Sequence, residues 1–531
     1  MARTYTWYNL RIILVLTLGS FTFGYGFSVI SNTIGQPGFI SYFNLENRTD
    51  YVNAITGTIN GLYCAGALFG ALHVGWMADA RGRKETMYLA SAVNVVGGAL
   101  ETGSVNMAMF LVSRFICGWG IGMMVVLIPI YQAEISPPDA RGFLVGQHGT
   151  WIVMGYAIAG WVGAGTYYSS NLSFQWRFPI ALSILPPLGL ALCSPWVPES
   201  PRWLLTRDRR EEAWTIMKRL HCGDDGNEKR LQFARDEFYQ MTEQVRADSA
   251  AWEAAGWKGM LMKRSYQKRF WMGFFIQYAA QSTGAQVIYG ESSQPYGVAI
   301  DMYIVLLYQN LGLSGGVPLI LGAAYVTVAW ISNFVGALLL DRVGRKPLLI
   351  AGLSGCMISL CLETAMIAQF AGTSNDAGLS MGVFFSFCFI TFYGGGIDVT
   401  GYVYCSEIFP THIRSQGVAW SLAGTFLSTL VYVEAAPTAL ADIKWRYYII
   451  FICLTALNIV IFYFWCPETK GHSLEEINAL FGDELVVRLG EVTEKQRNEM
   501  AAEVQVEDES KEFGVPVADK TTTTTALKAS G

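Results

Sequence analysis

The chain has 531 residues, of which 52% are hydrophobic and only 15% are charged, and its mean hydropathy is positive. This composition excludes an ordinary soluble domain and indicates a membrane protein. The formal net charge of −5 says little by itself, and no nucleic-acid partner is expected.

Apolar segments of roughly 20 residues, the length that crosses a ~30 Å hydrocarbon core, recur along almost the whole chain. They predict twelve transmembrane helices, because the strands of a membrane β-barrel would be about half as long and would alternate in polarity. The first run has no cleavage site of small residues behind it and is predicted to be retained as a helix. The expected spans are 10–31, 54–76, 87–105, 107–131, 143–166, 177–197, 270–290, 317–340, 347–370, 379–405, 415–437 and 446–466.

The Lys and Arg residues lie in alternate loops between these spans. Arg81 follows the second span, Arg141 the fourth and Arg342 the eighth, whereas the intervening loops are nearly free of cations. By the positive-inside rule, both termini and these loops are predicted to be cytoplasmic. The acceptor sequons at Asn47 and Asn171 would then lie outside, where glycosylation could reach them.

Two polar segments remain outside the spans. The predicted organisation is an N-terminal six-helix half at 1–197, a cytoplasmic linker with short helices at 198–269, a C-terminal six-helix half at 270–466, and a cytoplasmic tail at 467–531 that is largely disordered at its end. The ten cysteines are scattered mainly through the spans without metal-like spacing, so neither a metal nor a cofactor is expected.

The chain carries an internal duplication. “DARGRK” at Asp79 and “DRVGRK” at Asp341 each follow an apolar span and lie 262 residues apart (341 − 79 = 262). “YQAEISPPDARG” is matched by “YCSEIFPTHIRSQG”, and “PESPRW” in the first half is matched by “PETKG” in the second. Two six-helix halves related by an axis along the membrane normal, with a site at their interface, are typical of alternating-access transporters.

Acidic and basic residues at the cytoplasmic ends of the spans are predicted to form salt bridges that hold the halves together while the outside is open. The alternative is that they only set the topology, but acidic residues contribute little to topology and need another explanation. On the salt-bridge interpretation, Glu407→Ala should bias the protein toward the inward-open state. The predicted gating residues are Asp79, Arg83, Glu134 and Arg141 in the first half and Asp341, Arg345, Glu407 and Arg414 in the second.

These motifs resemble those of the sugar porter family of the major facilitator superfamily, in its fungal type. The “GRK” loops, “SRFICGWGIG”, “PESPRWL”, “SEIFPTHIR” and “PETKG” occur in the family's order over roughly residues 10–480. The resemblance implies an all-α membrane protein with twelve transmembrane helices in two pseudo-symmetric halves, which carries a monosaccharide or polyol without changing it chemically. Arg114 fits the family's arginine in span 4, and we group it with the gating salt bridges. An arginine inside a span costs ~2.5–3.5 kcal/mol on insertion scales, so Arg114 is a functional candidate even without the family.

The chain departs from the family in span 1. Proton-coupled members carry an aspartate there in the context “GYD”, where this chain has Gly26, and the missing acid favours facilitated diffusion. Asp398 is the candidate for a substitute proton carrier, because it lies nine residues before Glu407 (407 − 398 = 9) and therefore roughly 13 Å deeper along a helix. The alternatives for Asp398 are a hydrogen-bond partner for substrate hydroxyls and a static ion pair with a residue such as Arg114.

Amides, hydroxyls and aromatic faces are the groups that a sugar requires of its site. The resemblance places span 7 toward the substrate, where “QYAAQSTGAQ” keeps Gln281 of a glutamine pair and has Gln286 in place of an asparagine. Hydrogen bonding between helices is the alternative role of each amide. The predicted substrate-binding residues are Gln277, Gln281, Gln286, Tyr402, Asp398, His148, Gln147, Thr425 and Phe426.

The polar segment “GESSQPYGVAID”, residues 290–301, interrupts the expected end of span 7. It is interpreted as an extracellular loop, an insertion or a mistranslated piece, because polar irregular backbone is not tolerated facing lipid. Removal of residues 290–300 is expected to preserve uptake.

The sequence therefore predicts a multi-pass sugar transporter of the plasma membrane that works by alternating access as a monomer, with a sugar and the lipid bilayer as its partners. One alternative is a proton-coupled symporter of a polyol, sugar acid or disaccharide, with protons as a further partner. Another is a non-transporting sugar sensor that signals through its tail. An enzyme is not expected, because we find no constellation of nucleophile, base and oxyanion donors in the sequence.

Overall fold

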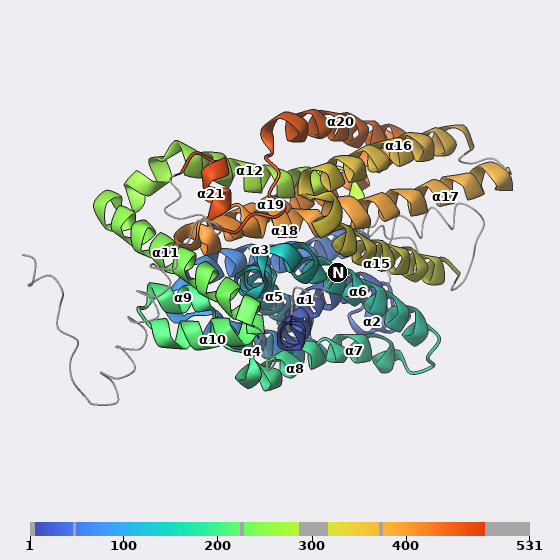
Figure 1. The fold of residues 1–531 in the computed structure, drawn as a ribbon. Coiled ribbons are helices and arrows are strands. Elements are labelled where there is room, and N and C mark those ends of the chain that lie inside the picture. Colours follow the sequence, from blue (N-terminus) through green and yellow to red (C-terminus); the bar gives the residue numbers. More distant parts are fainter. Residues whose placement is uncertain (1–5, 46–48, 223–227, 286–316, 371–374, 484–531) are drawn as a thin grey trace, which may run out of the picture.

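The computed structural model describes residues 6–45, 49–222, 228–285, 317–370 and 375–483. Across these ranges the regular structure is entirely helical, and long helices run side by side (Figure 1). Within the same ranges, eight segments are long and apolar enough to cross a membrane. They are Trp7–Ile34, Gly57–Arg81, Met107–Ile135, Leu172–Trp196, Ile320–Val343, Arg345–Phe370, Ser380–Glu407 and Tyr447–Trp465.

The first half of the chain contains long apolar helices that begin at conventional caps. Thr6 precedes α1 and Asn106 precedes α5, and the side chain of each accepts a hydrogen bond from a first-turn backbone N–H. The elements are α1 (Trp7–Ile34), α2 (Pro37–Tyr42), α3 (Thr49–Arg81), α4 (Arg83–Thr102), α5 (Met107–Ile135), η1 (Pro138–Ala140), α6 (Arg141–Tyr167), α7 (Leu172–Leu182), α8 (Leu185–Cys193) and η2 (Ser194–Trp196).

The charged segment that follows forms α9 (Pro201–Thr206), α10 (Arg210–Cys222) and α11 (Glu228–Met262). The remaining described elements are α12 (Arg264–Gln281), α15 (Val317–Val343), α16 (Arg345–Phe370), α17 (Asp376–Phe392), η3 (Tyr393–Asp398), α18 (Val399–Glu407), η4 (Thr411–Ile413), α19 (Arg414–Asp442), η5 (Lys444–Arg446), α20 (Tyr447–Trp465) and α21 (Glu476–Leu480). The polar segment 290–301 lies outside the described residues.

Two expected spans that the structure describes throughout are not single regular helices, and the helix of the span expected at 270–290 already ends at Gln281. The segment expected at 177–197 is divided into α7 and α8, because Pro186 and Pro187 lack the N–H groups that would continue the hydrogen-bond ladder. The segment expected at 379–405 contains η3, a turn of π-helix with three consecutive glycines. Such π-turns are rare in proteins, and those that occur are often found at functional sites.

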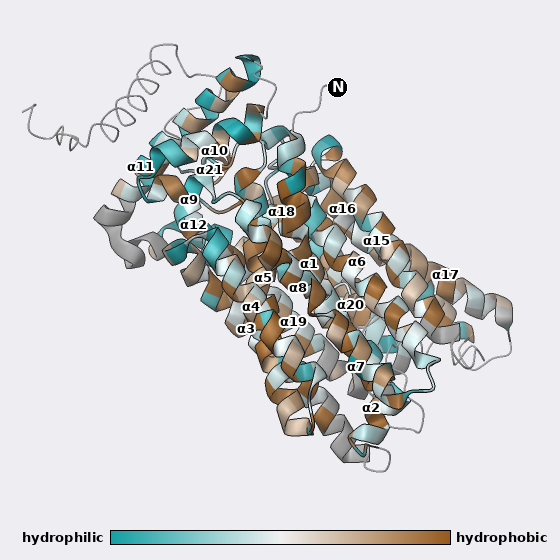
Figure 2. Ribbon diagram, turned by 90° about the horizontal axis from the view of Figure 1, so that it is seen from below, coloured by the Kyte–Doolittle hydropathy of each residue, from teal (hydrophilic) through white to brown (hydrophobic). Residues whose placement is uncertain are grey.

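The two halves of the chain meet chiefly along two helix pairs, α6 with α15 and α3 with α19, and α18 also contacts α5 and α6. Figure 2 shows α9, α10, α11 and α21 together at one end of the bundle, where hydrophilic residues gather. We call this the insert end. Helices α5 and α18 both finish near it, so the repeated charged motifs of the two halves lie at the same level.

Candidate functional site

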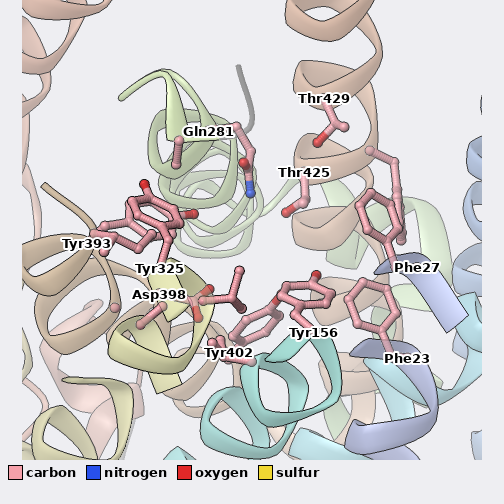
Figure 3. Close-up of a pocket in the computed structure, with 17 residues that line it drawn as sticks. Phe23, Phe27, Tyr156, Gln281, Tyr325, Tyr393, Asp398, Tyr402, Thr425 and Thr429 are labelled. Atoms are coloured by element: carbon pink, nitrogen blue, oxygen red, sulfur yellow. The ribbon is translucent and has the colours of Figure 1, made fainter. Parts of the chain in front are cut away.

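A cavity lies between the two halves. Its wall combines α1 and α6 of the first half with α12, α15, α17, η3, α18 and α19 of the second. Figure 3 shows Asp398 and Tyr402 on one side of this cavity and Phe23, Phe27, Thr425 and Thr429 around the rest. The aromatic lining residues are Phe23, Phe27, Tyr156, Tyr325, Tyr393, Tyr402 and Phe426, and the main polar ones are Gln281, Asp398, Thr425 and Thr429. Aromatic faces beside a few polar groups suit a ligand with both hydroxyls and apolar C–H faces.

Gln281 is the predicted amide that reaches the cavity. It lies at the last turn of α12, it is only 6% exposed, and its Oε1 has no hydrogen-bond partner among the described residues. A buried carbonyl oxygen without a partner costs free energy, which an incoming hydroxyl group would recover.

Asp398 lies at the end of the π-turn. Its Oδ2 accepts a hydrogen bond of 2.6 Å from Nδ2 of Asn333 on α15, and Oδ1 of Asn333 lies 3.5 Å from the hydroxyl of Thr150 on α6. The glycines before it allow close packing, since a Cβ on Gly352 would lie 2.8 Å from Cα of Gly396. The polypeptide is thus held tightly against α16 while the carboxylate faces the cavity.

Other predicted binding residues are engaged with the protein. Gln277 accepts a hydrogen bond of 3.1 Å from Thr425 and donates one of 3.6 Å to Sγ of Cys405, so its amide joins α12, α19 and α18. Thr425 and Phe426 line the cavity, whereas Gln277 lies behind that wall. Gln286 lies outside the described residues.

His148 and Gln147 also lie outside the cavity lining. Nδ1 of His148 lies 2.8 Å from the hydroxyl of Ser20, and its ring meets Tyr402 edge-on with centroids 4.9 Å apart. Gln147 donates to the backbone carbonyl of Phe143. His148 is therefore placed to orient Tyr402 from behind, rather than to touch a ligand directly.

Arg114 pairs within the first half and not across the interface. Its Nη1 lies 3.5 Å from Oε1 of Glu101 on α4, and its guanidinium lies 3.7 Å above the ring of Tyr63 on α3. It precedes Glu134 by 20 residues (134 − 114 = 20), about 30 Å along α5, so it cannot take part in contacts at the insert end. Among the described residues no ion pair joins it to Asp398, because Glu101 occupies Arg114 and Asn333 occupies Asp398.

The space beside Gly26 explains how the chain does without an acid in α1. A Cβ on Gly26 would lie 3.0 Å from the hydroxyl of Tyr63, so this tyrosine fills the position that a side chain at 26 would take. Glu101 of α4 is the acidic partner of Arg114 in this chain.

At the insert end, each half contains the same buried ion pair. Arg83 binds Glu134 through two hydrogen bonds of 2.9 Å, and Arg345 binds Glu407 through bonds of 2.7 and 3.2 Å. The third repeated motif, “PESPRW” in the first half and “PETKG” after the second, adds a further glutamate to each ion pair. Glu199 accepts from the backbone N–H groups of Arg83 and Lys84, and Glu468 accepts from those of Arg345 and Lys346. The two Arg–Glu pairs therefore join helices within one half, and Glu199 and Glu468 attach to each half the segment that follows its last helix.

Three further contacts join the halves directly. Nη1 of Arg414 lies 3.4 Å from Oε1 of Glu134, and Ser415 donates a bond of 2.8 Å to Asp79. Asp341 accepts bonds of 2.9 and 2.8 Å from the backbone N–H groups of Gly142 and Phe143 at the start of α6. The symmetric counterpart, an ion pair between Arg141 and Glu407, is not formed; Arg141 donates to the backbone carbonyl of His472 in the tail instead.

Sequence reasoning missed several of these residues. Asn333, Tyr156 and Tyr325 sit in apolar helices, where no periodic pattern separates a cavity-lining side chain from a packed one. It also missed a buried ion pair between Arg202 of α9 and Glu475, which ties the insert to the tail. Ser415 carried a weak signal, since it follows Arg414 directly.

Comparisons with known proteins agree with this architecture. The model of the family described as “Sugar (and other) transporter” matches residues 12–481. The MFS-type transporter criB of Aspergillus cristatus is 30% identical over 480 residues, which cover 90% of this chain and 94% of that protein. The high-affinity glucose transporter of Kluyveromyces lactis is 27% identical, over 90% of this chain and 86% of its own length. Among solved structures, the proton:xylose symporter XylE of E. coli bound to 6-bromo-6-deoxy-D-glucose has the same fold, with a TM-score of 0.75 at 23% identity over 89% of this chain and 99% of that chain.

Proposed function

Since the chain belongs to the sugar porter family of the major facilitator superfamily, we propose that it carries a sugar or a related polyol by alternating access, as a facilitator that is not coupled to protons. The observation that supports this proposal most strongly is the cavity between the halves, with polar groups of Gln281, Asp398 and Thr429 beside seven aromatic rings. Contacts between the halves at the insert end would close one route to that cavity while the other route is open.

The proposal includes the topology. Twelve helices cross the plasma membrane, with both termini, the α9–α11 insert and the insert end on the cytoplasmic side, and the protein functions as a monomer. The eight apolar segments account for eight of these crossings. Helices α4, α6, α12 and α19 account for the other four; they lie where spans were expected but are less uniformly apolar.

Facilitated diffusion is favoured by the way in which Arg114 is neutralised. In this chain the arginine is paired with a buried glutamate and covered by a tyrosine ring, away from the cavity lining. One observation favours the proton-coupled alternative, namely that Asp398 lines the cavity and has an amide rather than a cation as its partner.

Transport by the purified full-length chain in liposomes is the direct test of this function. We expect saturable entry of radiolabelled glucose, xylose or sorbitol, and inhibition by excess unlabelled substrate, because the cavity offers both acceptors and apolar faces. Protein-free liposomes are the control for leakage. Entry no faster than in that control, for every member of the panel, would contradict the proposal.

A further inference from the structure

The described lining of the cavity carries an acidic side chain and no basic one, which matters for whether a ligand is neutral, cationic or anionic. Asp398 is the acidic residue of its lining, and no Lys, Arg or His is found among the described residues that line it. Residues 286–316, which follow Ala285 in the chain, contain no Lys, Arg or His in the sequence. Within the described lining, the carboxylate therefore has no cation to balance it.

The hydrogen bond from Asn333 suits Asp398 as an ionised acceptor. The NH₂ group of Asn333 is turned toward Asp398 and donates to its Oδ2 at 2.6 Å, while Oδ1 of Asn333 faces the hydroxyl of Thr150 at 3.5 Å. An ionised carboxylate accepts about four hydrogen bonds, so the one bond from Asn333 leaves sites for hydroxyl or ammonium donors of a ligand. Asn333 lies on α15 and is not among the cavity-lining residues, so its bond to Asp398 does not occupy the side of the carboxylate that faces the cavity.

We propose that Asp398 is a charge filter that admits neutral and cationic sugars and rejects anionic ones, with Asn333 as its positioning residue. A ligand carboxylate beside Asp398 would meet a like charge in a poorly solvated space, where repulsion is strong. A ligand hydroxyl donates to the same oxygen, and an ammonium group also gains charge attraction. This inference rests on the proposed function and restricts it to one class of substrate.

Three probes with the same pyranose ring test the filter: glucose, glucosamine in its protonated form and glucuronate. In liposomes containing the full-length protein, we expect glucuronate to enter at least about tenfold more slowly than glucose, which corresponds to ~1.4 kcal/mol. Glucosamine should enter at least as fast as glucose. Asp398→Asn should raise the rate of glucuronate relative to glucose by about tenfold or more, whereas Asp398→Glu, which keeps the charge, should preserve the exclusion.

The control variant is Asp139→Asn, which removes an exposed acid of η1 far from the cavity lining and should leave the order of the three rates unchanged. Equal entry of glucose and glucuronate into wild-type liposomes would overturn the filter and leave the proposed function intact. Failure of all three probes to enter would overturn the filter, and failure of xylose and sorbitol as well would overturn the proposed function. The wild-type comparison decides the matter even where Asp398→Asn does not fold, and an unchanged glucuronate rate in a folded Asp398→Asn protein would also overturn the filter.

Discussion

Arg414→Ala is expected to shift the carrier toward the inward-open state while leaving it folded in the membrane. The variant removes the ion pair of 3.4 Å between the halves, but Glu134 keeps its two bonds to Arg83 and is not left as an uncompensated buried charge. A hydrogen bond to a charged group contributes ~1.5–3 kcal/mol, so the outward-open population should fall by about tenfold or more.

A cysteine in the cavity wall reports this shift. Thr429 lies 15 residues along α19 from Arg414 (429 − 414 = 15), about 22 Å from the insert end. Labelling of Thr429→Cys by a membrane-impermeant thiol reagent from the opposite side should decrease when Arg414→Ala is added. The protein without Thr429→Cys corrects for native cysteines, and Arg209→Ala, whose ion pair with Glu212 is exposed, is the matched control. Unchanged labelling at normal surface expression would contradict this role and show that Arg414 only sets the topology.

The sequence alone predicted this shift for Glu407→Ala, and the contacts now distinguish the two variants. Glu407 binds Arg345 of the second half and Thr469, which directly follows that half, and has no printed bond to the first half. Its removal leaves the buried guanidinium of Arg345 with a bond of 3.2 Å to Asp341 and one of 3.4 Å to the backbone carbonyl of Leu340, and without its main acidic partner. We therefore expect Glu407→Ala to act mainly on the stability of its own half.

Arg114→Gln is expected to reduce strongly the amount of folded carrier, and the double variant Arg114→Gln/Glu101→Gln is expected to restore it. Both side chains are at most 4% exposed, and removal of one partner of a buried pair costs about 3–5 kcal/mol because the other charge is left uncompensated. That loss is a large part of a typical stability of ~5–15 kcal/mol. Replacement of both charges by neutral amides of similar size removes the uncompensated charge.

Surface expression and thermal unfolding in detergent measure the rescue, and sugar uptake separates structure from transport. If the pair is static, the double variant should regain both fold and uptake. A double variant that folds but does not transport would show that Arg114 or Glu101 acts in the transport cycle, against the facilitator proposal.

Some features were predictable because they repeat or carry charge where charge is rare. The “GRK” and “SEIFP” motifs located Arg83, Glu134, Arg345 and Glu407, since ionisable residues in an apolar chain need partners. Sequence spacing could not say whether those partners lie in the same half, and the contacts place both ion pairs within a half.

Only some of the cavity-lining residues could be predicted from the sequence, and the physical reason differs from that for the ion pairs. Polar residues such as Gln281, Asp398 and Thr425 stand out in a hydrophobic helix, but Phe23 and Tyr156 do not, because nearly every face of these helices is apolar. Gln277 and His148 have suitable chemistry, yet tertiary packing bonds them to other helices. The sequence shows which side chains can bind a sugar but not which remain exposed to it.

The central claim is that the carrier equilibrates its substrate and does not concentrate it. A symporter that moves one proton gains about 2.3 kcal/mol per 100 mV of membrane potential, enough for more than tenfold accumulation. The measurement is the steady-state ratio of a non-metabolised labelled sugar inside and outside cells that lack their own carriers, with and without a protonophore, for the wild type and Asp398→Asn. We expect equal concentrations on the two sides and no effect of the protonophore; accumulation that collapses with the protonophore and disappears in Asp398→Asn would contradict the account and make Asp398 the coupling acid.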